Sequence, residues 1–154
     1  MNFDILRKRY INSIKPIIFN KFENYIKVCA PLRINFSAGW NDTPPYCNEN
    51  TGYTINIPIL YNNDFPIFVE IKKINDPKII LDNSNSQLEI LNIYELLNCN
   101  SPYTPFALHK SAILASGLIP INTKFDLHAF LKKFGGFKLT TNVKNIPIGS
   151  RFRH

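Results

Sequence analysis

One stretch of the chain, APLRINFSAGWNDTPPYCNEN at positions 30–50, constrains the fold more than any other. Apolar residues alternate with other residues before and within it, at Ile26, Val28, Leu32, Ile34 and Phe36. A period of two is typical of a half-buried β-strand. The pattern therefore predicts a strand over 26–36, with Arg33 and Asn35 projecting from its other face.

The residues after this strand predict a sharp turn that holds a carboxylate in a defined place. Ser37, Ala38 and Gly39 are small enough for the backbone to turn and to approach a ligand closely. The pair Pro44–Pro45 stiffens the exit from the turn. Asp42 lies between these two features, so we expect its position to be fixed.

Three side chains of this segment suit the binding of a sugar. Asp42 can grip adjacent hydroxyls through charge-assisted hydrogen bonds, which are roughly twice as strong as neutral ones, and Trp40 offers a flat ring. Arg33 stays charged, so it can hold a carboxylate or offset charge on a transferred phosphoryl group. Each residue alone also fits a structural role, as a snorkelling arginine, a core tryptophan or a turn-capping aspartate. Because the segment is short, we expect Arg33 and Asp42 to face one cleft.

Composition excludes several classes of protein. The chain has 154 residues, of which 45% are hydrophobic and 13% aromatic, so we expect one globular domain rather than disorder. No apolar run approaches the ~20 residues that span a bilayer, and the N-terminus lacks the pattern of a secretory signal, so we expect a cytoplasmic protein. The three cysteines and three histidines lack metal-ligand spacing, which predicts free thiols and no metal site.

The formal net charge of +7 does not by itself indicate a nucleic-acid-binding protein. The basic side chains gather toward the two ends of the chain, whereas residues 29–123 are net acidic. A nucleic-acid reader needs a basic stripe with interleaved aromatic residues or a known module. Neither is present in the sequence, so we expect no nucleic-acid partner.

The hydrophobic periodicity along the chain predicts a mixture of strands and helices. Helical spacing occurs over 4–14, 17–24, 108–118 and 124–134. Further strands are expected over 53–60, 67–74, 78–82, 87–91 and 137–143. This order predicts an α+β fold in which helices pack on one face of a mostly antiparallel sheet.

Several motifs resemble one family of enzymes. The run at 30–46 is similar to the first motif of the GHMP sugar kinases, and its ending NDTPPY at 41–46 resembles the L-fucokinase branch. The segment SPYTPF with LHKSA, within 101–112, resembles the approach to the next helix of that branch. The run FKLTTNVKNIPIGS at 137–150 resembles the strand and the start of the ATP loop. The resemblance extends, with gaps, over 28–150.

The resemblance implies the N-terminal half of a GHMP kinase fold, truncated at the start of the ATP loop. It divides the chain into a helical leader or stub of an upstream domain at 1–26, a partial kinase domain at 27–150, and a tail outside the family at 151–154.

The resemblance also implies roles for individual residues. Arg33 would lie near the catalytic carboxylate, and Asp42 would bind sugar hydroxyls with Gly39 and Asn41 beside it. Trp40 as a wall of the pocket is our own inference. The complete family enzyme uses ATP and Mg²⁺, and its ATP loop would begin at Pro147, Gly149 and Ser150.

Two departures from the family pattern matter. The glycine-rich run that continues the ATP loop is replaced by Arg151 to His154, where the given sequence ends. Ala38 stands where the fucokinase branch usually has glycine, and Asn41 stands where it usually has serine or threonine.

Three functional hypotheses remain open at this point. The favoured one is the N-terminal part of an ATP-dependent sugar-1-kinase resembling L-fucokinase, which converts L-fucose and ATP to L-fucose 1-phosphate; another GHMP kinase, such as a heptose kinase, is a variant of it. The second is a sugar-binding module or subunit that a second chain completes. The third is an unrelated basic structural protein. Which sugar is preferred, whether the chain is an enzyme alone, and its oligomeric state stay open.

We predict that this chain alone does not transfer phosphate from ATP, because phosphoryl transfer needs the nucleotide fixed by a complete amide cradle and its charge neutralised. The assay combines the purified protein with ATP, Mg²⁺ and L-fucose. A version extended through a glycine-rich loop and the remaining half-domain is run in parallel. Turnover by the chain of 154 residues would show that the nucleotide site is misplaced.

Overall fold

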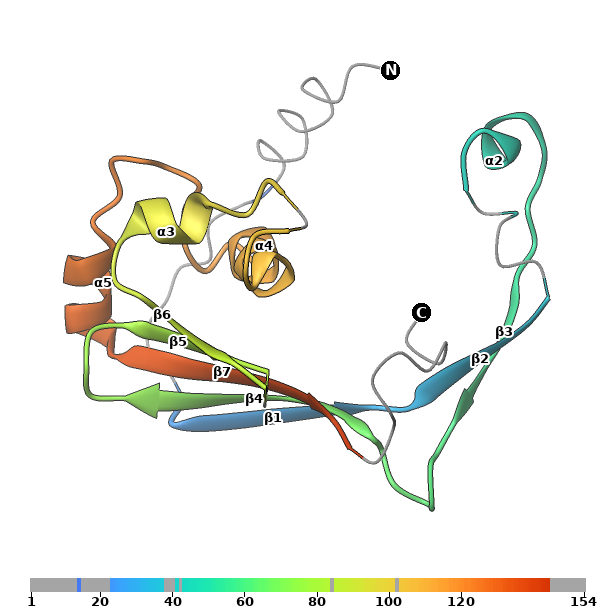
Figure 1. The fold of residues 1–154 in the computed structure, drawn as a ribbon, viewed down its shortest axis with the longest axis horizontal. Helices are drawn as coiled ribbons and strands as arrows, with labels where there is room; N and C mark the ends of the chain where they lie inside the picture. The colour runs from blue at the N-terminus through green and yellow to red at the C-terminus, as the bar shows by residue number, and fades with distance from the viewer. Residues whose placement is uncertain are drawn as a thin grey trace. The chain divides into compact units, whose positions relative to one another are not determined.

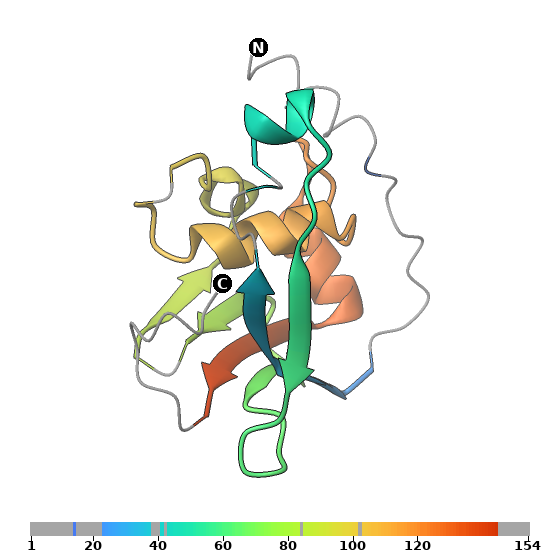
Figure 2. The ribbon, with the colours of Figure 1, turned by 90° about the vertical axis from the view of Figure 1, so that its right-hand side faces the viewer.

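A computed structural model of the chain describes residues 14, 23–37, 41, 43–83, 85–101 and 103–144. The chain divides into two compact units. Unit 1 consists of Met1–Ile26 and Glu70–Thr140, and unit 2 of Lys27–Val69 and Thr141–His154. Figures 1 and 2 show the backbone of the chain in two perpendicular views.

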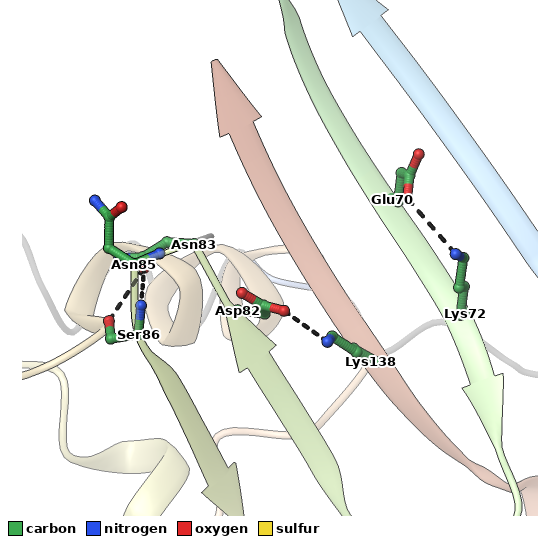
Figure 3. A network of polar contacts seen from close by, with 7 residues as sticks. All are labelled: Glu70, Lys72, Asp82, Asn83, Asn85, Ser86 and Lys138. Atoms are coloured by element: carbon green, nitrogen blue, oxygen red, sulfur yellow. Dashed lines mark hydrogen bonds and ion pairs between the residues drawn. The ribbon is translucent and has the colours of Figure 1, made fainter. Parts of the chain in front are cut away.

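The larger sheet has five strands in the order β1-β4-β7-β5-β6. Their bounds are Tyr25–Ala30 for β1, Ile67–Ile74 for β4, Gly136–Val143 for β7, Ile79–Asp82 for β5 and Gln87–Ile90 for β6. Strand β5 pairs parallel to β7 and antiparallel to β6. Figure 3 shows β4 and β7 running in opposite directions, so the sheet is mostly antiparallel.

Within its described residues, unit 1 contains the helices α3 (Ile93–Leu97), α4 (Ala107–Ala115) and α5 (Leu127–Phe134). In both views the three helices lie on the same side of β5, β6 and β7 (Figures 1 and 2). The most deeply buried side chains come from these strands, these helices and the loop after α4, namely Ile79, Leu81, Ile90, Leu96, Ile119, Leu127 and Leu131. The prediction of an α+β fold with helices on one face of a mostly antiparallel sheet is confirmed. Its assignment to a GHMP kinase stays a prediction.

Local sequence explains where the helices begin and end. The Asn92 side chain accepts a hydrogen bond from the backbone N–H of Glu95, 3.0 Å away, at the start of α3. Asp126 does the same for Ala129 of α5 at 2.9 Å. Such N-caps satisfy amide groups that have no partner within the helix. At its other end α5 stops at Gly135, whose φ of 97° suits glycine.

A buried lysine joins α3 to α4. Lys110 is only 4% exposed, and its Nζ donates to the carbonyl oxygen of Asn98, 3.3 Å away, at the C-terminal end of α3. The last carbonyl groups of a helix carry partial negative charge, which a cation stabilises. Lys110 belongs to the LHKSA segment singled out in the sequence, and it connects that segment to the preceding helix.

Polar contacts fix the turn and the register around β5. The Asn83 side-chain oxygen accepts hydrogen bonds from the backbone N–H groups of Asn85 and Ser86, at 3.1 and 2.9 Å (Figure 3). This arrangement is typical of asparagine in turns. Across the parallel pair, Lys138 of β7 lies 2.6 Å from the Asp82 carboxylate of β5 (Figure 3).

Unit 2 contains a two-stranded antiparallel sheet, formed by β2 (Leu32–Ser37) and β3 (Ile55–Ile59), which we call the ribbon. Apolar residues pair across one of its faces, as Leu32 with Ile59 and Ile34 with Ile57. Partners in an antiparallel pair share a face. The opposite face carries the pair of Arg33 with Pro58 and the two paired asparagines at 35 and 56. The ribbon is therefore amphipathic, as the alternation in the sequence predicts.

The prediction of a single strand over 26–36 is wrong. The structure divides this segment into β1 and β2, which belong to different sheets. Pro31 lies between them, and proline cannot donate a backbone hydrogen bond to a continuing ladder. In addition, Val28 and Phe36 are 61% and 64% exposed, so this alternation does not mark burial throughout.

Most other elements agree with the expected positions. The expected helices over 108–118 and 124–134 correspond to α4 and α5, which are a few residues shorter. The short helices α2 (Tyr46–Glu49) and α3 were not expected. The helix predicted over 4–14 lies outside the described residues, except at Ile14, which has no regular structure. For the helix over 17–24, Glu23 and Asn24 are described and are not helical. No helix within the described residues is long and apolar enough to span a bilayer.

We predict that Gly136→Ala destabilises the fold, because Gly136 packs directly against the turn before β5. A Cβ atom at Gly136 would overlap the carbonyl oxygens of Asp76 and Lys78 and approach the Lys78 nitrogen to 2.9 Å. Backbone atoms cannot move aside cheaply, so we expect a loss of about 1–3 kcal/mol in unfolding free energy. Urea denaturation followed by circular dichroism measures this loss. Coinciding midpoints for the two proteins would contradict the close packing.

Candidate functional site

The candidate site is the loop that connects the two strands of the ribbon. Strand β2 ends at Ser37 and β3 begins at Ile55, and these two residues are paired across the ribbon. The pairing brings the two ends of a long loop together. In the sequence, the predicted turn and the polar residues that follow it fall between these two strands.

A second contact closes the loop further along. Gly52 lies directly against the backbone of Asn41: a Cβ atom at Gly52 would overlap the Asn41 carbonyl oxygen and lie 2.7 Å from its carbon. Only glycine allows two backbones to approach so closely. The contact thus links Asn41, near the start of the loop, to Gly52, just before β3. Residues 41–52 consequently form a closed loop of their own.

The short helix α2 forms the tip of this loop. It follows the Pro44–Pro45 pair, whose connecting peptide bond is cis. Its backbone is held by hydrogen bonds from the N–H of Cys47 to Thr43 at 3.3 Å, from Asn48 to Pro45 at 3.0 Å, and from Asn50 to Tyr46 at 2.9 Å. The backbone that carries Asn48 and Glu49 is therefore fixed locally.

A shallow hollow of about 550 Å³, open to solvent, is lined by Asn41 and by residues 47–52. Four of these residues, those at 48–51, are exposed. The lining offers three asparagine amides, one threonine hydroxyl, one thiol and the Glu49 carboxylate. Amides both donate and accept hydrogen bonds, as vicinal hydroxyls do. The hollow thus suits a neutral ligand that carries several hydroxyl groups.

The structure describes only part of the predicted site, and the roles of its residues stay predictions. Asn41 lies in the hollow, whereas Gly39, Trp40 and Asp42 lie outside the described residues. Pro147, Gly149 and Ser150, assigned to the start of the ATP loop, also lie outside them.

Arg33 is an exposed residue of β2, paired with Pro58, and it is not part of the lining of the hollow. Whether Arg33 and Asp42 share a cleft stays a prediction.

Among the residues that the structure describes, two groups have shifted pKa values, and neither lines the hollow. Partial burial lowers the pKa of His109, whose ring packs edge-on against Phe106 with ring centroids 5.0 Å apart. The pKa of Lys78 is raised, chiefly by its hydrogen bond to Glu89. Within the described residues, no group of three or more histidine, cysteine or acidic side chains could hold a metal ion.

Two characterised proteins resemble the chain. The Arabidopsis thaliana protein named bifunctional fucokinase/GDP-fucose pyrophosphorylase is 35% identical over 97 residues, which cover 62% of this chain and 9% of that protein. The Bacteroides fragilis protein named L-fucokinase/L-fucose-1-P guanylyltransferase is 29% identical over 158 residues, covering 96% of this chain and 17% of that protein. The chain is similar to a part of these two bifunctional fucokinases. The resemblance to the fucokinase branch is thereby confirmed.

The chain spans less than a fifth of the length of either bifunctional fucokinase. No model of a protein family matches it. The relationship to the fucokinases therefore applies to a part of those proteins, and it does not by itself assign an activity to this chain.

Sequence reasoning missed two residues of this loop. Glu49 and Gly52 were not singled out, although they follow the proline pair within a polar run, NENTG at 48–52. A polar run between a stiff turn and a strand is a signal for a binding loop. What the sequence could not show is that Gly52 touches Asn41, because that contact depends on how the loop closes.

We predict that Gly52→Ala opens the loop, because the added methyl group displaces the Asn41 backbone. The chain has one tryptophan, Trp40, next to Asn41, so its fluorescence reports on this change directly. We expect a shifted emission maximum and about 1–3 kcal/mol lower stability. Thr51→Ala, which adds no atom at the neighbouring position, serves as the control. Identical spectra for Gly52→Ala and the wild type would disprove the contact.

Proposed function

We propose that the loop between β2 and β3 forms the sugar-binding side of an L-fucokinase-like site. The observation that carries this proposal is the polar hollow next to Asn41, in a chain related to two proteins whose names include fucokinase. The ligand in this proposal is L-fucose or a similar monosaccharide. A ligand of this class carries hydroxyls that match the amide and carboxylate groups of the lining.

The proposed roles of the residues follow from their chemistry. Asp42 grips two sugar hydroxyls, and the Trp40 ring covers the apolar face of the sugar. Arg33 lies on the polar face of the ribbon, where its permanent charge is available to orient a carboxylate or to stabilise a phosphoryl group. In a complete kinase of this type, ATP with Mg²⁺ supplies the phosphoryl group, and Pro147, Gly149 and Ser150 would begin the loop that holds it.

Catalysis in such a site depends mainly on positioning. Transfer to a sugar hydroxyl requires the acceptor oxygen to be held in line with the phosphoryl group, and most of the rate enhancement comes from this alignment and from charge stabilisation. The contribution of this loop would be to fix the orientation of the sugar ring. A fixed backbone at the site is therefore essential, and the Gly52–Asn41 contact supports it.

We predict that Asp42→Ala weakens the binding of L-fucose by about tenfold or more, because hydrogen bonds to a charged group contribute about 1.5–3 kcal/mol. Affinity in the wild type is expected to be weak, since this loop provides one side of a site. Isothermal titration calorimetry of the full chain measures both values.

Asp76→Ala is the control, because it removes an exposed carboxylate of unit 1 that pairs only loosely with Lys78, at 3.7 Å. It should bind L-fucose as the wild type does. Equal affinities for the wild type and Asp42→Ala would remove Asp42 from the sugar site.

A further inference from the structure

We propose that Glu49 is a second hydroxyl-binding carboxylate of this site, and that it selects neutral sugars over anionic ones. The inference rests on the proposed function, because it names a further residue of the same site. Glu49 was not among the predicted site residues. Its assignment comes from its place in the hollow and from its charge.

The position of Glu49 is defined by the elements around it. It is the last residue of α2, and the hydrogen bond from the Asn50 N–H to the Tyr46 carbonyl closes the turn that carries it. Glu49 lines the open hollow together with Asn41, whose backbone is in contact with Gly52. The hollow therefore brings together residues from two separate parts of the loop.

The carboxylate of Glu49 has free hydrogen-bonding capacity. Among the described residues, no hydrogen bond or ion pair engages it, in contrast to Glu89, which pairs with Lys78 at 3.0 Å, and Glu95, which accepts from the Leu91 N–H at 2.8 Å. An ionised carboxylate accepts hydrogen bonds only, and it can accept from two adjacent hydroxyls at once. A vicinal diol is thus a matching ligand for this group.

The charge of the lining narrows the class of ligand. Glu49 is the single ionisable acid or base among the lining residues other than the thiol of Cys47, and no lysine or arginine is among them. A carboxylate repels phosphate and carboxylate ligands through its negative charge. A neutral polyhydroxylated molecule meets no such repulsion.

The amides complete the recognition of such a molecule. Asn48 and Asn50 flank Glu49 in the chain and also line the hollow. Each amide offers two donor hydrogens and one acceptor oxygen, whereas the carboxylate only accepts. Sugar hydroxyls act as donors and acceptors at the same time, so this mixture satisfies more of their hydrogen-bonding groups than carboxylates alone would. Exposed polar loops that contain asparagine are common in proteins. This loop differs from an ordinary one because its asparagines line a hollow.

The test compares Glu49→Gln with the wild type in calorimetric titrations with L-fucose. The substitution preserves the shape of the side chain and removes its charge. We expect at least a tenfold loss of affinity for L-fucose, together with unchanged circular dichroism and thermal stability. Glu23→Gln is the matched control, because it makes the same chemical change at an exposed residue outside the hollow.

A second titration uses L-fucose 1-phosphate to test the selection by charge. For this anion, Glu49→Gln should bind no more weakly than the wild type, because the lost hydrogen bonds are offset by the removal of repulsion. A parallel loss for both ligands would overturn the charge selection.

The possible failures can be told apart. Binding of L-fucose by Glu49→Gln as tight as by the wild type would overturn the role of Glu49 while leaving the sugar site intact. A folded wild-type chain that does not bind L-fucose at all would overturn the proposed function, and the role of Glu49 with it.

Discussion

The candidate site depends on the contact between Gly52 and the backbone of Asn41. The base of the loop is set by the pairing of Ser37 with Ile55, but this pairing alone would leave a long and open connection. Where Gly52 meets Asn41, no side chain fits between the two backbones. This constraint closes the connection near its base, and the residues at both sides of the contact line one open hollow.

Sequence patterns predicted the core elements well, because their residues follow simple periodicities. Strands β4, β5 and β7 and helices α4 and α5 occur close to where alternation and helical spacing place them. The division of the first strand was missed, because apolar alternation continues across Pro31 while the hydrogen-bonding ladder does not. The short helix α3 was missed because five residues carry too little periodicity. Its Asn92 cap was nevertheless visible in the sequence.

The place of the candidate site stays a prediction, because most of the residues named for it lie outside the described part of the chain. The motif at 30–46 includes Asn41, which lines the hollow. Gly52 and Glu49 line the same hollow, and the contact of Gly52 with Asn41 depends on how the loop closes. A contact between residues on the two sides of a short turn can be inferred from the sequence. A contact between residues at the two ends of a loop of this length can be found only in a structure.

The ribbon that carries the loop has a consequence for how such proteins diversify. Among the described residues, strands β2 and β3 pair with each other in a sheet of their own, and the most deeply buried side chains belong to other elements. Substitutions among the exposed residues at 48–51 thus change the polar groups of the hollow at little cost to folding. Gly52 is different, because its contact with Asn41 leaves no room for a side chain. The loop can therefore vary in its chemistry while its closure is kept.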